Sequence, residues 1–499
     1  MDCSGEDSRR AIAIIESMVR SCLVVFALSL SLPAQQLQVK SATSHKIELS
    51  WTGSAPAWIV ERLAASGKFE KLADSSTPGF TDEKIDPFGI YQYRVKAGEN
   101  GQPSNTVTAG APPAGILKGA AAPKGADGTR YGLNSALAFD ENGDPALAWV
   151  WFDPNGDGDS SDTAVYFVHW DRAKYQWRSP VKVAVVGNIT NQNVEPVSLG
   201  FDVRTGAAAL AYPIEGHDGF TLAQSKDGGM TWQPSAVTAG WEGTVTSTSF
   251  ALAAGRIYLA ANSEGAGVRY IESEFPADPS QWKSQPAPVL SGTKYQTNTN
   301  VSLVLDAAGK PLIAYILQPE DGNNTSFAVW RPGEANAVKA ADSNNQAPDS
   351  PNVSLAFGGG RFGLLFSAQR DAKNSDVGVW FTASANGASW SAPVPLPVDG
   401  PRSANSPVGL ALDSHARLAA VFGSNSGTDT LKCNFPALSR STDGARWTTC
   451  GLGRSLNDEF AAQPNSVHAA FAGNDKLYVV WHQGGESKNG QGLLMWHER

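Results

Sequence analysis

Short apolar or alternating segments come in pairs along the last three quarters of the chain, and a tight turn separates the two members of each pair. The first pair lies at 135–139 and 145–149, and similar pairs recur roughly every 50–60 residues. The later pairs lie at 197–202 and 207–212, 249–252 and 256–260, 301–306 and 311–315, 353–357 and 362–366, 408–413 and 418–422, and 467–471 and 477–481. Segments of this length and pattern predict antiparallel β-strands joined as hairpins.

A second apolar hairpin follows most of these pairs and often ends in a tryptophan, so each unit holds about four strands. These tryptophans are Trp177, Trp232, Trp282, Trp390 and Trp447. One four-stranded sheet cannot bury both of its faces, whereas several such sheets packed radially form a β-propeller. We predict a propeller over residues 126–499 with seven blades, six being the alternative. A linear β-solenoid would have shorter repeats and no sets of four strands.

The last unit lacks an outer strand after its third strand, which ends near Trp496. Residues 111–125 are rich in Ala, Gly, Pro and Lys and predict a linker. Residues 116–118, within this linker, could supply the missing strand and close the ring.

Residues 37–110 contain a separate group of alternating segments, at 47–51, 58–63, 91–97 and 104–109. Turn signals at a spacing of roughly 8–12 residues predict a small β-sandwich here. The whole chain is therefore expected to be all-β, with a sandwich followed by a propeller.

The aromatic residues of the first domain carry a family resemblance. Trp51 lies on an early strand, Tyr91 and Tyr93 fall in a Tyr-x-Tyr-Arg-Val run, and Asp82 precedes Pro87. This pattern resembles a fibronectin type III domain. The resemblance implies a spacer or adhesion module, and we expect Trp51 and Tyr93 in its core.

Composition agrees with a turn-rich β protein. The 499 residues include 50 Gly, 30 Pro and 15 Trp, and only 17% are charged. The formal net charge is −9, which argues against a nucleic-acid-binding surface because such a surface is basic. A collagen-like chain and a multi-span membrane protein are also excluded.

Residues 1–34 have the features of a signal peptide. Arg9, Arg10 and Arg20 precede an apolar run over 22–34, and we expect cleavage after Ala34. Met18 is an alternative start, and an uncleaved anchor is the alternative to cleavage. The protein is therefore expected to be secreted, periplasmic or at the cell surface, without a membrane span after cleavage.

Cysteine usage fits export. Cys3 and Cys22 leave with the signal peptide, whereas Cys433 and Cys450 remain. An isolated pair in an exported chain predicts a disulfide, which would close a loop of about 16 residues. Two buried free thiols are the alternative.

An Asp-box motif recurs in the repeat region. Residues 225–232 read Ser-x-Asp-x-Gly-x-Thr-Trp, and residues 384–390 and 441–447 are shortened versions. The region therefore resembles a sialidase-type, BNR-repeat propeller. The resemblance implies a structural role for the motif, whose residues are Ser225, Asp227, Gly229, Thr231 and Trp232. Carboxylate and hydroxyl groups can hold such a turn while its glycines adopt positive φ.

The same resemblance places a ligand site at the loops that precede the inner strands. A sialidase binds the substrate carboxylate with three arginines and uses a tyrosine nucleophile activated by a glutamate, with an aspartate as acid/base. The weak candidates at these loops are Arg130, Arg402, Tyr295 and Glu242. Two arginines in place of three, and no Arg-x-Pro motif at the start of the domain, argue against sialidase activity.

Asparagine and histidine positions suggest structural roles. Asn recurs before the inner strands, which favours a turn or cap role over ligand contact. These positions are 134, 193, 300, 352, 405 and 465. The seven histidines show no metal-ligand spacing and are expected to be surface or core residues.

A calcium loop is expected between the second and third strands of the first repeat. The pattern Asp-x-Asn-x-Asp-Gly is followed by two more aspartates, and oxygen ligands at alternate positions suit Ca²⁺. The candidate ligands are Asp153, Asn155, Asp157, Asp159 and Asp162. The alternative is a solvated acidic turn, and the expected role is to stabilise the loop.

Three functions are compatible with this organisation. The first is an exported, non-catalytic binding protein with a glycan or protein ligand at the propeller mouth. The second is an exo-acting glycoside hydrolase of sialidase type, and the third is a surface scaffold without a pocket ligand. The sequence specifies no oligomeric state.

Overall fold

The chain divides into two compact units, Met1–Ala111 and Pro112–Arg499. The computed structural model describes residues 35–42, 46–64, 68–84, 90–110, 115–116, 135–140, 142–151, 161, 163–174, 176–187, 197–202, 205–214, 216–238, 240–297, 299–320, 325–343, 352–371, 374–396, 408–423, 437–451, 464–483 and 492–497. Strands dominate both units, and one short 3₁₀ helix, η2 (Pro279–Gln281), is described beside them. The prediction of an all-β protein is confirmed.

The first unit consists of two antiparallel sheets. One has the order β1 (Leu37–Ala42), β2 (Ile47–Trp51) and β5 (Gly79–Asp82), and the other has the order β4 (Phe69–Ser75), β3 (Trp58–Leu63), β6 (Ile90–Ala97) and β7 (Val107–Gly110). The last strand begins three residues later than its alternating pattern predicts. At its predicted start, the hydroxyl of Ser104 accepts a hydrogen bond from the amide of Val95 at 3.0 Å.

Aromatic rings fill the space between these two sheets. The rings of Trp51 and Trp58 meet edge to face with centroids 5.7 Å apart, and Tyr93 is fully buried. The hydroxyl of Tyr93 donates a 2.8 Å hydrogen bond to Oδ2 of the buried Asp82. Trp51 and Tyr93 are thus core residues, as expected, while the fibronectin type III assignment stays a prediction.

The described strands of the second unit form seven antiparallel sheets. The first sheet contains β9 (Ser135–Phe139), β10 (Pro145–Trp151), β11 (Ala164–Asp171), β12 (Gln176–Trp177) and β13 (Val181–Val185); the second contains β14 (Ser198–Asp202), β15 (Ala207–Tyr212), β16 (Phe220–Ser225) and β17 (Gln233–Val237); and the third contains β18 (Val245–Ala253), β19 (Arg256–Ser263), β20 (Gly267–Glu274) and β21 (Gln285–Pro286). The fourth sheet contains β22 (Thr293–Tyr295), β23 (Ser302–Leu305), β24 (Pro311–Pro319), β25 (Ser326–Trp330) and β26 (Val338–Asp342), and the fifth contains β27 (Val353–Gly358), β28 (Arg361–Asp371), β29 (Asn374–Ser384) and β30 (Val394–Pro395). The sixth sheet contains β31 (Val408–Leu412), β32 (Leu418–Phe422), β33 (Ala437–Ser441) and β34 (Thr448–Gly451), and the seventh contains β35 (Pro464–Phe471), β36 (Leu477–Gln483), β37 (Gly492–His497) and β8 (Gly115–Ile116).

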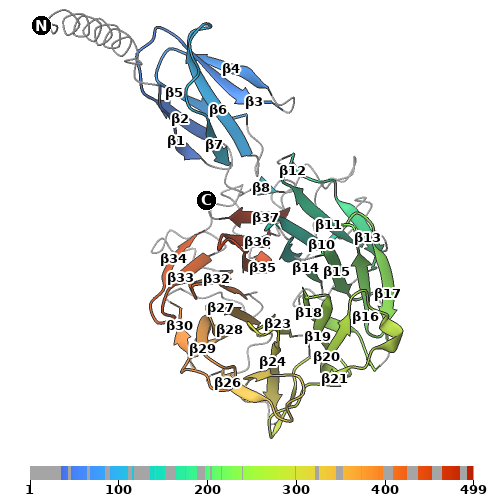
Figure 1. Cartoon of the computed structure of the whole chain (residues 1–499). Helices are drawn as coiled ribbons and strands as arrows, with labels where there is room; N and C mark the ends of the chain where they lie inside the picture. The colour runs from blue at the N-terminus through green and yellow to red at the C-terminus, as the bar shows by residue number, and fades with distance from the viewer. Residues whose placement is uncertain are drawn as a thin grey trace, which may run out of the picture. The chain divides into compact units, whose positions relative to one another are not determined.

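The sheets of this unit form a closed ring around a central axis (Figure 1). The inner strands are β9, β14, β18, β23, β27, β31 and β35. Each lies beside the inner strand of the next sheet, and β35 lies beside β9. This closed, radial arrangement is a β-propeller.

The last sheet combines the two ends of the second unit. Strand β8 pairs antiparallel with β37, with Ile116 opposite Leu494 and Gly115 opposite Met495. The outer strand of this sheet therefore comes from the start of the unit, and its other three strands come from the end of the chain.

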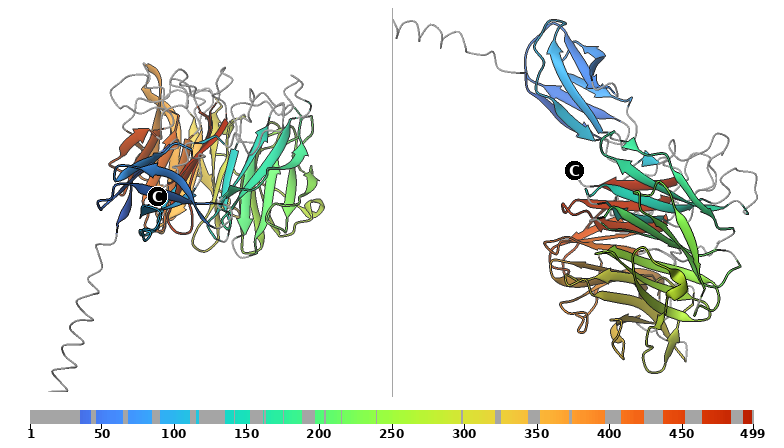
Figure 2. Two further views of the ribbon diagram at one scale, coloured as in Figure 1. Left: turned by 90° about the horizontal axis from the view of Figure 1, so that it is seen from above. Right: turned by 45° about the vertical axis from the view of Figure 1, so that its right-hand side comes forward.

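The two ends of the ring carry different connections. Because neighbouring strands of a sheet run in opposite directions, the loops before the inner strands lie at one end, which we call the mouth. The turns after the inner strands, and the turns between the third and fourth strands, lie at the opposite end, which we call the turn end. Figure 2 shows the ring from two further directions.

Hydroxyl groups of the inner strands hydrogen-bond neighbouring sheets to one another. The backbone amides of Leu303, Leu355 and Leu410 each donate to a serine of the preceding inner strand: Ser249, Ser302 and Ser354, at 2.9, 2.9 and 3.0 Å. Ser135 and Ser466, whose hydroxyls are 3.1 Å apart, link the first sheet to the last. These strands surround a central cavity of about 160 Å³.

Asn300 also acts between sheets, and this corrects the expected turn or cap role at that position. Its Nδ2 donates to the carbonyl oxygen of Val353 at 2.6 Å, and the amide of Val353 donates to its Oδ1 at 2.8 Å. Both residues are buried. The side-chain amide of Asn300 therefore hydrogen-bonds the backbone of the next inner strand in the way that a neighbouring strand would.

Candidate functional site

The turn between β16 and β17 is held by Ser225 and Asp227. The hydroxyl of Ser225 accepts from the amide of Gly229 at 2.8 Å and donates to Oδ1 of Asp227 at 2.7 Å. Asp227 also accepts from the amide and the hydroxyl of Thr231, at 2.9 and 2.6 Å. Although desolvation opposes the change, these hydrogen bonds lower the pKa of Asp227 to about 2. The polar side chains of this motif therefore hydrogen-bond to one another and to the backbone of their own turn.

Each Asp-box turn packs on the preceding sheet. Gly229 has a φ of +85°, and a Cβ at this position would lie 2.0 Å from the ring of Phe167. The ring of Trp232 meets the same phenylalanine edge to face at 5.0 Å. Trp447 packs on Phe381 of the preceding sheet in the same way, at 5.2 Å. These turns therefore act as wedges between neighbouring sheets.

At the mouth, Tyr295 and Glu242 both lie against the hairpin between β19 and β20. The carbonyl of Glu242 accepts from the amide of Gly265 at 3.2 Å, and a Cβ at Gly267 would come within 2.2 Å of the ring of Tyr295. The hydroxyl of Tyr295 donates to the carbonyl oxygen of Ala287, and burial raises its pKa. The side chain of Glu242 is exposed. The Tyr295 hydroxyl is thus held by the backbone in its protonated form.

The other predicted site residues lie outside the described part of the chain, and their roles stay predictions. They are Arg130, Arg402, Asp153, Asn155, Asp157, Asp159, Asp162 and Cys433, together with the expected signal peptide. Cys450 lies in β34, where its backbone pairs with Leu438 of β33. No helix among the described residues is long and apolar enough to cross a membrane.

A polar cavity of about 470 Å³ lies at the turn end, between the first two sheets. Its wall includes Asp140 and His169, which are both buried and whose Oδ2 and Nε2 lie 3.1 Å apart. Desolvation opposes ionisation of Asp140, but hydrogen bonds from His169 and two turn amides lower its pKa. Among the described residues, none hydrogen-bonds Nδ1 of His169. The pair fixes the orientation of the imidazole ring.

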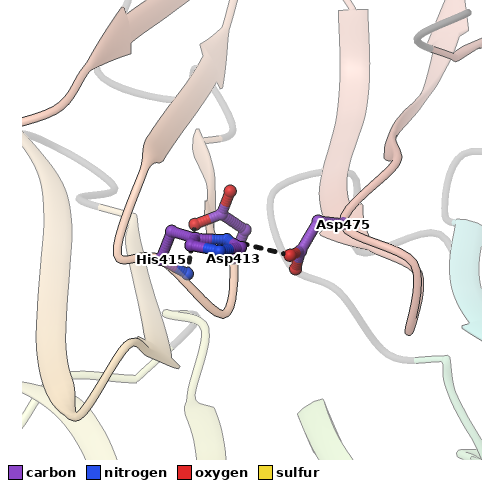
Figure 3. A group of neighbouring side chains, drawn as sticks. All are labelled: Asp413, His415 and Asp475. Atoms are coloured by element: carbon purple, nitrogen blue, oxygen red, sulfur yellow. Dashed lines mark hydrogen bonds and ion pairs between the residues drawn. The ribbon is translucent and has the colours of Figure 1, made fainter.

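A group of Asp413, His415 and Asp475 at the turn end has the residue types of a cation site (Figure 3). Oδ1 of Asp413 accepts from the amides of His415 and Arg417, and its Oδ2 accepts from Nε of Arg417. Asp475 accepts from the amide and the hydroxyl of Ser414, and its Oδ2 lies 3.1 Å from Nδ1 of His415. These carboxylates thus already have protein donors, and the group joins the sixth sheet to the seventh.

Beside this group is a cavity of about 310 Å³ with three arginines in its wall. We call it the arginine cavity. Arg417 directly precedes β32, Arg440 lies in β33, and Arg446 lies in the third Asp-box turn. Phe471 of the seventh sheet contributes an apolar wall.

Neither turn-end cavity was singled out from the sequence. One signal does recur: an aspartate that opens the inner hairpin faces a basic residue in the third strand or directly after it. Asp140 faces His169, and Asp306 accepts from Arg331 at 3.0 Å. In the sixth sheet the same two positions are Asp413 and Arg440, but Phe471 comes from the seventh sheet, and no spacing in the sequence relates it to them.

No protein-family model matches the chain, and no curated protein matches it. Among solved structures, it is similar to a Hadza microbial sialidase, at 9% identity over 93% of this chain and 95% of that chain, with a TM-score of 0.43. It is also similar to an ulvan lyase of polysaccharide lyase family PL25, at 12% identity over 74% and 94% of the two chains, with a TM-score of 0.46. The intramolecular trans-sialidase of Ruminococcus gnavus matches at 10% identity over 74% and 95%, with a TM-score of 0.38. Likeness at these identities concerns the fold alone, and these TM-scores carry no argument about substrate or reaction.

Proposed function

We propose that the protein is an exported carbohydrate-binding β-propeller that recognises a glycan at its mouth without cleaving it. The observation that carries this proposal is the Asp-box turn, which recurs in three sheets at the same place and wedges each sheet against its predecessor. The turn gives the ring its resemblance to sialidase-type propellers, and that resemblance points to a carbohydrate ligand.

The state of Tyr295 supports binding rather than hydrolysis. A tyrosine nucleophile needs a nearby base that draws off its proton. Here the hydroxyl donates to a backbone carbonyl, and burial raises its pKa, so both effects retain the proton. Glu242 is exposed and does not hydrogen-bond this hydroxyl.

The predicted signal peptide, disulfide and calcium loop belong to the same proposal. All three fit a protein that works outside the cytoplasm, where disulfides form and calcium is available. A protein ligand at the mouth and a scaffold role are the competing outcomes of the test below.

The test combines a glycan array with a panel of fluorogenic glycosides, including a sialoside, and uses the full chain after signal removal. We expect binding to at least one class of glycan and no release of the fluorophore. Hydrolysis that Tyr295→Phe abolishes would establish the sialidase-type alternative. Failure to bind any glycan on the array would overturn the proposal.

A further inference from the structure

The larger turn-end cavity lies between the first two sheets, beside the buried pair of Asp140 and His169. We call it the His169 cavity. Its volume of about 470 Å³ is within the range of small-ligand sites. One side of the wall includes Arg178, which directly follows β12, and the opposite side includes Lys226 of the first Asp-box turn. The cavity therefore separates the first sheet from the turn that wedges the second sheet against it.

Between the fourth and fifth sheets, an arginine bridges the corresponding gap. Nη1 of Arg331 donates to Oδ2 of Asp306 at 3.0 Å, and its Nη2 donates to the carbonyl oxygen of Asn386 at 3.3 Å. Asp306 opens the inner hairpin of the fourth sheet, whereas Asn386 lies in the Asp-box turn of the fifth sheet. The side chain of Arg331 thus extends from its own sheet to the turn of the next one.

His169 holds the same place in the first sheet, but an imidazole is shorter than an arginine side chain. Its Nε2 lies 3.1 Å from Oδ2 of Asp140, and its ring packs on Phe201 with centroids 5.5 Å apart. Among the described residues, no group hydrogen-bonds its Nδ1. His169 is therefore not hydrogen-bonded to the Asp-box turn in the way that Arg331 is, and the space that an arginine would cross belongs to the cavity.

The charges in the wall nearly balance. Asp144 is bound by Arg172, and Asp227 accepts hydrogen bonds from its own turn. With a neutral His169, the four carboxylates slightly outnumber the three basic side chains, so the wall has no excess positive charge for an anion. Its carboxylates already have donors, which disfavours a cation. These charged residues are Asp140, Asp144, Asp171, Asp227, Arg172, Arg178 and Lys226.

Several polar groups in this wall keep hydrogen-bonding capacity for a ligand. Lys226 is exposed and Arg178 is partly exposed, and neither forms an ion pair with a residue that the structure describes. Nη1 of Arg178 contacts only the sulfur of Met230 at 3.5 Å. Asp171 accepts from the amide of Lys174 at 3.2 Å, and its carboxylate has further lone pairs. Donors and acceptors are thus available in one cavity.

This combination selects hydroxyl groups, because a hydroxyl both donates and accepts hydrogen bonds and carries no charge. One hydroxyl can donate to Asp171 while its neighbour accepts from Arg178 or Lys226. Phe201 and Ala173 add apolar surface to the wall. A carbon ring with adjacent hydroxyl groups meets the polar and the apolar parts together.

We propose that the His169 cavity binds a neutral sugar residue, as a second site at the end of the ring opposite the mouth. This inference does not depend on the function proposed for the mouth, because every residue that carries it belongs to the turn end of the first two sheets.

Calorimetric titration of the full chain after signal removal tests the proposal. The probes are the methyl glycosides of glucose, galactose and mannose, together with the uronate and the amino sugar that correspond to whichever glycoside binds. We expect at least one neutral glycoside to bind, its charged counterparts to bind more weakly, and salt to have little effect. No binding of any neutral glycoside, or tighter binding of a charged counterpart, would overturn the proposal.

His169→Arg is the most direct variant, because it places the bridging arginine of the fourth sheet in the first sheet. We expect it to fold with a Tm near that of the wild type, since Asp140 can pair with an arginine as Asp306 does. It should bind the glycoside at least about tenfold more weakly, as loss of one hydrogen bond to a charged group would cause.

The double variant Arg178→Gln/Lys226→Gln removes the two basic donors and decides the question should His169→Arg unfold. We expect a similar loss of affinity. Arg256→Gln is the matched control, because Arg256 is 41% exposed and pairs with Glu272 on the third sheet. Unchanged affinity in the cavity variants, or an equal loss in the control, would overturn the proposal.

Hydrogen exchange with and without the glycoside separates this site from the mouth. We expect the sugar to slow exchange in residues 169–174 and 225–229, which border the cavity. Protection confined to the mouth, as in residues 240–244 before β18, would overturn this inference and support the proposed function. Protection at the turn end would keep the inference even if no glycan bound at the mouth.

Discussion

Asn300 and Val353, from adjacent sheets, exchange two hydrogen bonds at 2.6 and 2.8 Å, although 53 residues separate them in the chain. Replacement by alanine would leave a buried amide and a buried carbonyl without a partner, which costs about 1–3 kcal/mol for each group. We therefore expect Asn300→Ala to lower the free energy of unfolding by about 2–4 kcal/mol. Urea unfolding followed by fluorescence measures this loss.

Asn474→Ala is the control for this variant. Asn474 is exposed and accepts only a local turn hydrogen bond from the amide of Lys476 at 3.1 Å. Its replacement should change stability by no more than about 1 kcal/mol. A similar loss in both variants would contradict the role assigned to Asn300.

Gly229 and Gly228 provide a matched pair in the Asp box. Both have positive φ, +85° and +69°, but an added Cβ meets Phe167 at Gly229 and nothing within 4 Å at Gly228. Gly228→Ala should cost about 1–2 kcal/mol from backbone strain. Gly229→Ala should cost about 1–3 kcal/mol more, because the methyl group pushes the wedge away from the preceding sheet. Thermal unfolding compares the two, and equal losses would exclude the wedge.

Asp227 should make the propeller less stable in acid. Its pKa is lowered to about 2 in the folded protein, below the value of about 3.9 expected for an unfolded chain. The carboxylate therefore contributes stability that is fully present above pH 4 and is lost as pH falls towards 2. Asp227→Asn should lower Tm at pH 6, and the difference from wild type should shrink between pH 4 and pH 2. A constant difference across this range would contradict the assignment.

Calcium is expected to stabilise the protein through the loop that begins at Asp153. We expect millimolar Ca²⁺ to raise the Tm of the wild type, and Asp157→Asn combined with Asp159→Asn to remove most of this increase. Carboxylates at alternate positions bind Ca²⁺ through several oxygen ligands, whereas Mg²⁺ prefers a tighter octahedral set. Mg²⁺ at the same concentration is the control. No shift with Ca²⁺ would exclude the site.

The repeat of the propeller could be predicted because each sheet buries both faces against its neighbours. Every unit therefore needs apolar residues at the same spacing. The Asp-box turns could be predicted for a similar reason, since their hydrogen bonds lie within a few residues of one another. Strands with weak alternation were missed. In β4, for example, most side chains are partly or fully exposed, so burial imposes little pattern.

Contacts between repeats could not be predicted in the same way. The position of Asn300 before a strand is visible in the sequence, but its partner on the next sheet is not, so a local cap was the expected role. The arginine cavity depends on Arg417, Arg440 and Phe471, which the ring brings together from separate turns and strands. A single sequence carries no spacing rule for such a set.

The pairing of Ile116 with Leu494 has a consequence for synthesis of the protein. During translation, β8 is synthesised early, but its partner β37 is synthesised only after nearly the whole remaining chain. Until the last residues leave the ribosome, the first and sixth sheets each present an uncovered apolar face. A chain that ends before β37 would keep these apolar faces exposed, and we expect chaperones and proteases to recognise it.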